Sequence, residues 1–486
     1  MLDSVLKSIS AVPEFILSIS TLISLFWGTI KQKKIDRNMA ATAIVSLILL
    51  CILLFLSGKS EQFFWNSLFI YTSFSVHSKI ILYCYSAVAL FFLFSFLAEY
   101  KIKQFEWIFI AIFVVIGGSV ALSSNHFLTL FIGLEMSHLS QYILVNADRD
   151  ASNTNEATIK FFTINLISTG LMLFGVSLIY GFTGTGFFNT VYYFFESYSS
   201  NFEYAGAIVG MMFVLMGICF KLPIFPFHAW IQDLYQVSAL PIILFIASIP
   251  KIITVFSLLH LLTYPFHGAF ICWRYLLIGL AIFSMIWGSL MALRQQNLRR
   301  MFACSTVSDM GFLLIGPSMG GDFGLSSAIT YIIFYTLNIL GVFSLLIVFE
   351  KNCHRLNDIR DLSGIIKEMP LLSGIFCFLI LSFAGIPPFP GFFAKIYILE
   401  STINRSAYFI AILSVLITVI NAGYYLNVLK FFVLKSSALK INKFTLSEKY
   451  FVKVMIVLII IALCGMVIFP LKLLEIVHSI AVSILF

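Results

Sequence analysis

Long apolar segments separated by short polar ones follow one another along the whole chain. Each is about as long as the roughly 20 residues that a membrane-spanning helix needs. The segments cover residues 13–30, 39–57, 78–97, 105–123, 126–145, 157–183, 204–224, 238–262, 271–292, 301–318, 325–349, 370–400, 406–429 and 453–470. The pattern predicts an all-α polytopic membrane protein with about 14 transmembrane helices. We expect a short terminal or interfacial helix over 471–486 and an exposed, aromatic-rich loop over 184–203.

The composition agrees with a membrane protein and excludes other classes. The 486 residues are 60% hydrophobic and only 11% charged, whereas soluble domains carry about 25% charged residues. These values exclude a soluble globular enzyme, a disordered chain and a nucleic-acid-binding protein. The eight cysteines stand singly, without a CxxC pair or a Cys/His cluster, so we expect no zinc, iron–sulfur or haem site.

The basic residues predict the orientation of the chain. With fourteen spans, 21 of the 30 Lys and Arg residues, Arg299 among them, fall in the loops of one side, and six, Lys79 among them, fall on the other. Cytoplasmic-side loops of membrane proteins are enriched in Lys and Arg. We therefore expect the basic loops to face the cytoplasm or matrix and both termini to face outside.

Three lysines, Lys221, Lys251 and Lys395, fall inside predicted spans, as does Glu135. Charges at the centre of a bilayer are costly and are usually functional. Burial disfavours the ammonium form of a lysine, and a nearby carboxylate favours it. A lysine whose carboxylate partner moves is therefore a switchable proton carrier. The alternative interpretation is a set of static ion pairs that hold helices together.

Polar residues recur at helical spacing around these charges. One face carries Glu135, His138 and Tyr142, a second carries Ser248, Lys251 and Thr254, and a third carries Tyr331, Tyr335 and Asn338. Asp309 and His228 are further candidates for the same polar axis. Such rows either hydrogen-bond helices to one another or form a hydrated path, which the buried lysines favour. Asp309 is equally well explained as a static partner of Ser305 or of a basic group.

Two proline-rich segments predict broken helices and an internal repeat. FKLPIFPFHAW (220–230) and AGIPPFPGFFAK (384–395) both contain Pro–x–x–Pro beside a buried lysine, 164 residues apart. Proline breaks or kinks a helix, and paired interrupted helices are typical of transporters with inverted repeats. We therefore expect two inverted five-helix repeats, over 105–262 and 271–429. They are preceded by a three-helix segment over 1–104 and followed by a helix and tail over 430–486.

These motifs carry a family resemblance over nearly the whole chain. They are Pro13-Glu14-Phe15, GLEMSHLSQYIL (133–144), NEATIKFF (155–162), FKLPIFPFHAW (220–230), ALRQQNLRRMFACSTVSDMGF (292–312) and GIPPFPGFFAK (385–395). The chain resembles membrane subunit 2 of proton-pumping NADH–ubiquinone oxidoreductase (respiratory complex I), in the antiporter-like superfamily. The resemblance implies that Glu135 pairs with Lys221 and that Lys251 and Lys395 complete a hydrated axis of proton transfer. Asp309 departs from the family, which often has histidine there.

The resemblance also implies partners. The chain would be a proton-translocating subunit of a translocase with no redox site and no bound cofactor of its own. NADH, FMN, iron–sulfur clusters and ubiquinone would bind to partner subunits. The partners would be other membrane-arm subunits, including antiporter-like subunit 4 and the small membrane subunits, together with membrane lipid. The abundant Phe, Ile and Lys suggest an AT-rich genome, which favours the mitochondrial inner membrane, with a bacterial plasma membrane as the alternative.

Three other functions remain open from the sequence. A subunit of a multisubunit Na⁺/H⁺ antiporter complex would use the same lysines without a respiratory partner. A scaffold that only spaces other subunits would tolerate neutral residues at all four buried charges. An independent solute permease would need a substrate-sized pocket, and the chain shows no sugar-binding or carboxylate-binding motif.

Overall fold

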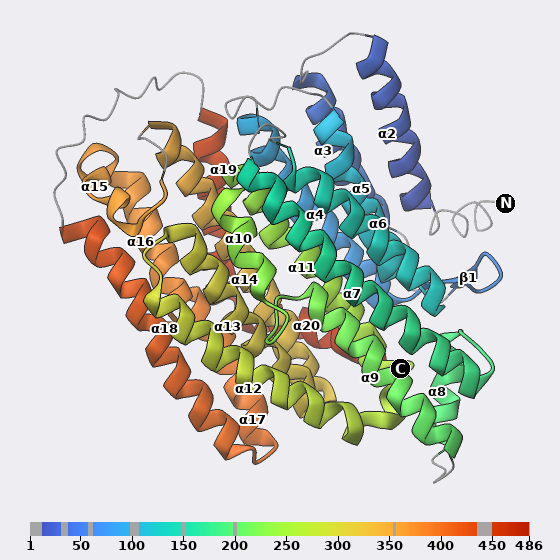
Figure 1. Ribbon diagram of the computed structural model, residues 1–486. Helices are drawn as coiled ribbons and strands as arrows, with labels where there is room; N and C mark the ends of the chain where they lie inside the picture. The colour runs from blue at the N-terminus through green and yellow to red at the C-terminus, as the bar shows by residue number, and fades with distance from the viewer. Residues whose placement is uncertain are drawn as a thin grey trace. The chain divides into compact units, whose positions relative to one another are not determined.

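The computed structural model describes residues 12–30, 37–56, 62–97, 106–147, 152–197, 202–352, 356–434 and 450–485 (Figure 1). The chain divides into two compact units. The first contains Met1–Leu222, Phe245–Trp273 and Ser479–Phe486, and the second contains Pro223–Leu244 and Arg274–His478. Each unit is described by itself below.

The first unit is built from helices and one short hairpin. Its helices are α2 (Val12–Ile30), α3 (Arg37–Leu56), α4 (Ser73–Leu97), α5 (Glu106–Leu122), α6 (Phe127–Val145), α7 (Ser152–Thr183), α8 (Phe188–Glu196), α9 (Phe202–Lys221) and most of α11 (Leu240–Thr263), followed by the 3₁₀ turn η2 (His267–Ala269). Strands β1 (Gln62–Phe64) and β2 (Phe69–Tyr71) pair antiparallel, with Phe63 opposite Ile70.

The described residues of the second unit form helices joined by short loops. It contains α10 (Ala229–Val237), most of α12 (Phe270–Arg294), α13 (Leu298–Met319), α14 (Gly321–Asn352), η3 (Ile359–Leu362), α15 (Ile365–Glu368), α16 (Pro370–Ala384), α17 (Pro390–Asn404), α18 (Tyr408–Leu434) and α19 (Tyr450–Ile468). Helix α20 (Pro470–Leu485) follows α19 at a bend of 86° and contributes to both units.

The helical pattern predicted from the sequence is confirmed in outline. Every predicted segment coincides with a helix, and 370–400 coincides with the pair α16 and α17. Within the described residues, eight helices are long and apolar enough to cross a membrane, and four more apolar helices are shorter. The prediction of about 14 spans therefore stays a prediction. Two details were wrong, because a β-hairpin precedes α4 and the segment predicted as a loop over 184–203 contains α8.

Glycines lie in the two most extensive helix–helix contacts of the first unit. Helix α5 packs on α6, and α7 runs along α9 (Figure 1). A Cβ atom on Gly117 would lie 2.7 Å from the carbonyl oxygen of Gly133, and one on Gly175 would lie 2.6 Å from that of Gly210. Small residues let helix backbones approach closely in membranes. These contacts fix α6, α7 and α9, which carry the charged residues described next.

Both predicted helix breaks are present. Helix α9 ends at Lys221, and α10 begins only at Ala229 after the two prolines. Helix α16 ends at Ala384, Gly385 adopts a left-handed φ of 74°, and α17 begins at Pro390. Helix α11, by contrast, continues through Pro250. Lys221 and Lys395 therefore lie beside interrupted backbone, whereas Lys251 lies within an intact helix.

Candidate functional site

Glu135 and Lys221 form a buried ion pair in the first unit. The ammonium nitrogen of Lys221 lies 2.7 Å from Oε1 of Glu135. The Lys221 side chain is fully buried, and the Glu135 side chain is 16% exposed. The pairing predicted from the family resemblance is thus present in the geometry. Glu135 is therefore the member of the pair that is accessible from outside the helix packing.

A third helix, α7, adds a hydrogen bond to the pair. The hydroxyl of Thr169 donates a hydrogen bond to the same Glu135 oxygen at 2.9 Å. One residue earlier, Ser168 donates to the carbonyl oxygen of Gly217 on α9 at 2.7 Å. Hydrogen bonds to a charged group are stronger than those between neutral groups. Sequence reasoning missed Thr169, although Asn165, Ser168 and Thr169 interrupt the apolar residues of this helix.

His138 lies one turn beyond Glu135 on α6 and is buried. Its Nδ1 is 3.4 Å from the amide nitrogens of both Gln141 and Asn165. Tyr142 is also buried, and its ring makes edge contacts with Phe161 and Phe162. The predicted face of α6 is therefore a buried polar row that continues onto α7.

Lys251 is buried on α11 together with Ser248 and Thr254. The Thr254 hydroxyl donates to the carbonyl oxygen of Pro250 at 2.7 Å, the carbonyl that lies one turn earlier. All three residues of the predicted polar face of this helix are thus buried. The structure thus places a second lysine deep inside the first unit.

Lys395 is buried in the second unit, at the break between α16 and α17. Its ammonium donates to the carbonyl oxygens of Phe383 at 3.1 Å and Ala384 at 3.5 Å. The ring of Phe312 lies 5.6 Å away. Carbonyl groups at the end of a helix carry a partial negative charge. The break therefore supplies the lysine with acceptors that an intact helix would use internally.

A small cavity of about 20 Å³ joins Lys395 to other polar residues of this unit. Asp309, Tyr331, Tyr335 and Asn338 all line it. Such a volume holds one water molecule. The hydroxyl of Tyr331 donates to Oδ1 of Asp309 at 2.9 Å, and Oδ1 of Asn338 is buried without a hydrogen-bond partner among the described residues. Asp309, whose role the sequence left open, thus lies on the Lys395 cavity.

Tyr335, which also lines this cavity, and His228 make further contacts. Tyr335 hydrogen-bonds through its hydroxyl to Thr306 at 3.0 Å. His228 lies just before α10, with its ring stacked on Phe225 and next to Trp287. His228 does not line the Lys395 cavity, so the structure places it in the break rather than among the residues around Asp309.

Two residues predicted to lie in loops are buried instead. Lys79 is on α4 and pairs with Glu14 of α2, with only 2% of its side chain exposed. Arg299 is on α13 and donates to Glu350 at 2.7 Å and to the carbonyl oxygens of Ser238 and Leu356. Both predictions were wrong because each residue lies within one turn of a predicted segment end, where apolar runs locate helix ends poorly.

The family follows from comparison with known proteins. Residues 124–421, more than half of the chain, match the family described as "NADH:quinone oxidoreductase/Mrp antiporter, TM". The chain belongs to this family. Glu135, Lys221, Lys251, Asp309 and Lys395 all lie inside the part of the chain that defines the family.

Curated relatives in the family cover most of the chain. It is 35% identical over 421 residues to "NADH-quinone oxidoreductase subunit N" of Pelagibacter ubique, spanning 86% of this chain and 88% of the relative. It is 33% identical over 400 residues to the protein of that name from Nitrosomonas europaea, spanning 82% and 83%. The resemblance to subunits of complex I that the motifs indicated is confirmed.

Solved structures of the family share the fold. A chain of respiratory complex I from Thermus thermophilus superposes with a TM-score of 0.79 at 20% identity, covering 95% of this chain and 98% of that one. A chain of the Mrp complex from Dietzia gives 0.80 at 19% identity, covering 100% and 98%. At such identities the likeness establishes the fold alone. The Glu14–Lys79 pair lies outside the matched residues 124–421.

Proposed function

We propose that the chain is a proton-translocating membrane-arm subunit of an NADH:quinone oxidoreductase and has no redox site of its own. The observation that carries this proposal is the buried Glu135–Lys221 pair inside the family region of a chain whose relatives are NADH-quinone oxidoreductase subunits. Buried lysines in a membrane protein mark ion and proton pathways. The redox chemistry would belong to partner subunits that bind NADH, FMN, iron–sulfur clusters and ubiquinone.

Glu135 and Lys221 act as the adjustable pair in this proposal. When the carboxylate contacts the ammonium, the charged form of the lysine is stabilised; when the contact lengthens, the buried ammonium loses its counter-charge and releases its proton. Thr169 shares the same carboxylate oxygen. A shift of the carboxylate toward Thr169 therefore weakens its hold on the lysine without leaving Glu135 unbonded.

Lys395 is the second proton carrier in this proposal. Backbone carbonyls hold its ammonium in place, and Asp309 on the same cavity is the acid that alters its proton affinity. Tyr331, bonded to Asp309, and Asn338 would orient a water molecule between them. Protons enter from the side of the basic loops, load Lys221 or Lys251, pass to Lys395 and leave to the outside. The segments 105–262 and 271–429 are the two inverted repeats that carry these steps.

The test replaces a lysine without changing the surface. Lys221→Met or Lys395→Met, in the assembled complex reconstituted in vesicles, should lower the number of protons pumped per NADH oxidised. Lys160→Met is the matched control, because Lys160 is a half-exposed lysine on α7 that pairs with Glu156 on the surface. Wild-type stoichiometry in both Lys221 and Lys395 variants would refute the proposal.

A second candidate is a subunit of a multisubunit Na⁺/H⁺ antiporter. It is favoured by the family description and by the fold shared with a chain of the Mrp complex. Gentle detergent extraction separates the two: a respiratory complex brings flavin-bearing and iron–sulfur-bearing subunits with this chain, and an antiporter complex brings neither. The relatives are bacterial and support a bacterial plasma membrane, while the mitochondrial inner membrane suggested by composition stays a prediction.

A further inference from the structure

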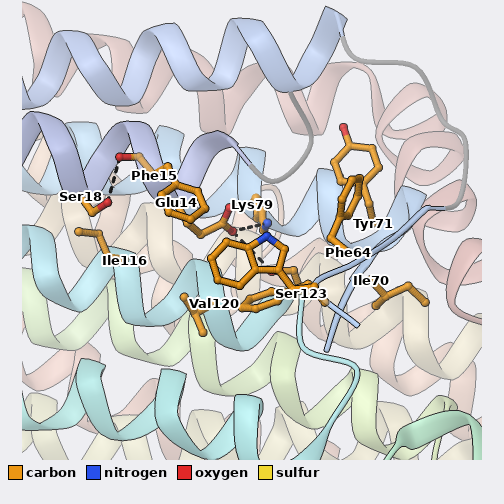
Figure 2. A pocket seen from close by; sticks show the side chains of 12 residues that line it. Glu14, Phe15, Ser18, Phe64, Ile70, Tyr71, Lys79, Ile116, Val120 and Ser123 are labelled. Atoms are coloured by element: carbon orange, nitrogen blue, oxygen red, sulfur yellow. Dashed lines mark hydrogen bonds and ion pairs between the residues drawn. The ribbon is translucent and has the colours of Figure 1, made fainter. Parts of the chain in front are cut away.

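A cavity of about 230 Å³ lies in the first unit, and none of Glu135, Lys221 and Lys251 lines it. Its walls are mainly apolar: aromatic rings of Phe15, Phe64, Trp65 and Phe69 and the aliphatic side chains of Ile116 and Val120. Figure 2 shows Phe15, Phe64, Ile116 and Val120 around it. For comparison, an engineered cavity of about 150 Å³ accepts benzene. The space is therefore large enough for part of an organic ligand.

The polar end of this cavity offers an acceptor. Lys79 donates to Oε1 of Glu14, and Ser123 donates to the same oxygen at 3.5 Å (Figure 2). The lysine side chain is 2% exposed and the glutamate 14%. Both residues line the cavity, and the carboxylate is the more exposed of the two charged groups. An occupant that donates hydrogen bonds fits this end, and an anion does not.

The cavity lies at the helix ends opposite the basic segments. Glu14 is in the first turn of α2, Ser123 directly follows α5, and the hairpin precedes α4. The segments 31–36 and 98–105, which follow α2 and α4 in the chain, carry five lysines and only two acidic residues. By the distribution of basic residues, the cavity lies at the outer surface of the membrane. This is the depth at which lipid head groups lie.

The hairpin holds a tryptophan against the cavity in a strained turn. Trp65, Asn66 and Ser67 have left-handed φ values of 54°, 54° and 65°, a conformation that costs a bulky residue about 1–2 kcal/mol. Such strain clusters at ligand-binding sites. The indole lies 5.2 Å from the ring of Phe15 and 6.1 Å from that of Phe69, and it is 57% exposed. Tryptophan at this depth is typical of contact with lipid head groups.

An apolar strip leads from the cavity along α2. Phe15, Ile19, Leu22 and Phe26 are all exposed, and their spacing places them on one face of the helix. The strip runs from the cavity toward the opposite end of the membrane. An acyl chain whose head group is at the cavity would follow it.

The geometry points to a binding site for an outer-leaflet aminophospholipid. Its ethanolamine arm enters between the aromatic rings and donates from the ammonium to Glu14, its phosphate stays at the mouth, and its acyl chains lie along the α2 strip. A primary ammonium provides both the positive charge and the N–H donors that the carboxylate and the rings favour. A choline head group lacks the donors, and a glycerol head group lacks the cation.

The assembled complex can be tested with photoactivatable lipids. Phosphatidylethanolamine, phosphatidylcholine and phosphatidylglycerol carrying the same acyl diazirine are crosslinked in nanodiscs, and labelled peptides from 12–30 and 62–71 are quantified. We expect about tenfold more labelling by the ethanolamine lipid, because among the three lipids it alone combines a cation with N–H donors for a charge-assisted hydrogen bond to Glu14. Equal or greater labelling by either of the other two lipids would overturn the assignment.

Two variants locate the site. Val120→Trp fills the cavity and should abolish the labelling, whereas Ile52→Trp, on the exposed face of α3, should leave it unchanged. Glu14→Gln combined with Lys79→Met removes both charges, so that neither is left unpaired, and it should remove the head-group preference while apolar labelling persists. Wild-type preference in the double variant, or wild-type labelling in Val120→Trp, would show that this cavity is not the site.

Discussion

The ammonium nitrogen of Lys395 lies 3.1 Å from the carbonyl oxygen of Phe383, in the last turn of α16. This contact joins the two halves of a broken helix through a charge. The carbonyl is available because α16 ends one residue later, so that no N–H group four residues further on in the helix donates to it. The break and the buried lysine therefore depend on each other.

Gly385 should be required for that arrangement. Its φ is 74°, and a Cβ atom there would lie 2.9 Å from Cδ and 3.0 Å from Nζ of Lys395. Gly385→Ala should cost about 1–2 kcal/mol in backbone strain and displace the ammonium, so that proton pumping per NADH falls. Gly374→Ala on α16, where nothing lies within 4 Å, is the control. Undiminished pumping in Gly385→Ala would show that the position of the Lys395 ammonium does not affect proton translocation.

Thr169 should tune the Glu135–Lys221 pair. Thr169→Val removes the hydrogen bond to Glu135 and keeps the shape of the side chain. A hydrogen bond to a charged group contributes about 1.5–3 kcal/mol, so we expect a change in pumping rate of about tenfold with normal assembly. Thr163→Val, an exposed threonine of the same helix that bonds only the backbone of Lys160 in the described structure, should have no effect. Initial pumping rates in vesicles decide between these outcomes.

The contact between α7 and α9 should be sensitive to a single methyl group. A Cβ atom on Gly175 would meet the backbone of α9 at 2.6 Å. Gly175→Ala should therefore destabilise the subunit by about 1–3 kcal/mol and lower the thermal stability of the assembled complex. Gly181→Ala, on the same helix with nothing within 4 Å, should be neutral or slightly stabilising, since alanine favours helices. A melting curve unchanged by Gly175→Ala would contradict the close packing.

Arg299 should not be replaceable by lysine. Its guanidinium bonds Glu350, Ser238 and Leu356 at once, and a lysine offers one point of charge instead of a planar fork. Arg299→Lys should cost about 1–3 kcal/mol through the lost hydrogen bonds. Arg300→Lys tests the neighbouring position, where a partly exposed arginine lies 3.7 Å from Asp233, and it should cost less than about 1 kcal/mol. Equal melting temperatures for the two variants would argue against the buried network.

The sequence predicted the helices well because the bilayer imposes one length and one composition on every span. Lys221, Lys251 and Lys395 could be identified because each lies in the middle or at the proline-rich end of an apolar segment. Glu14–Lys79 and Arg299–Glu350 could not, since their charges lie near segment ends, where an interior position and a loop have the same sequence pattern. The partners of Lys395 were also beyond prediction, because backbone carbonyls have no signature in a sequence.

The two buried ion pairs described in the first unit place the acid before the base in the chain. Glu14 precedes Lys79 by 65 residues, and Glu135 precedes Lys221 by 86. During synthesis each carboxyl group thus enters the membrane while its lysine has not yet been made. Until the lysine is made, the carboxyl group can stay neutral in an apolar environment by keeping its proton. The lysine that follows then finds its carboxyl partner already in place. Neither lysine therefore has to enter the membrane as an unpaired ammonium.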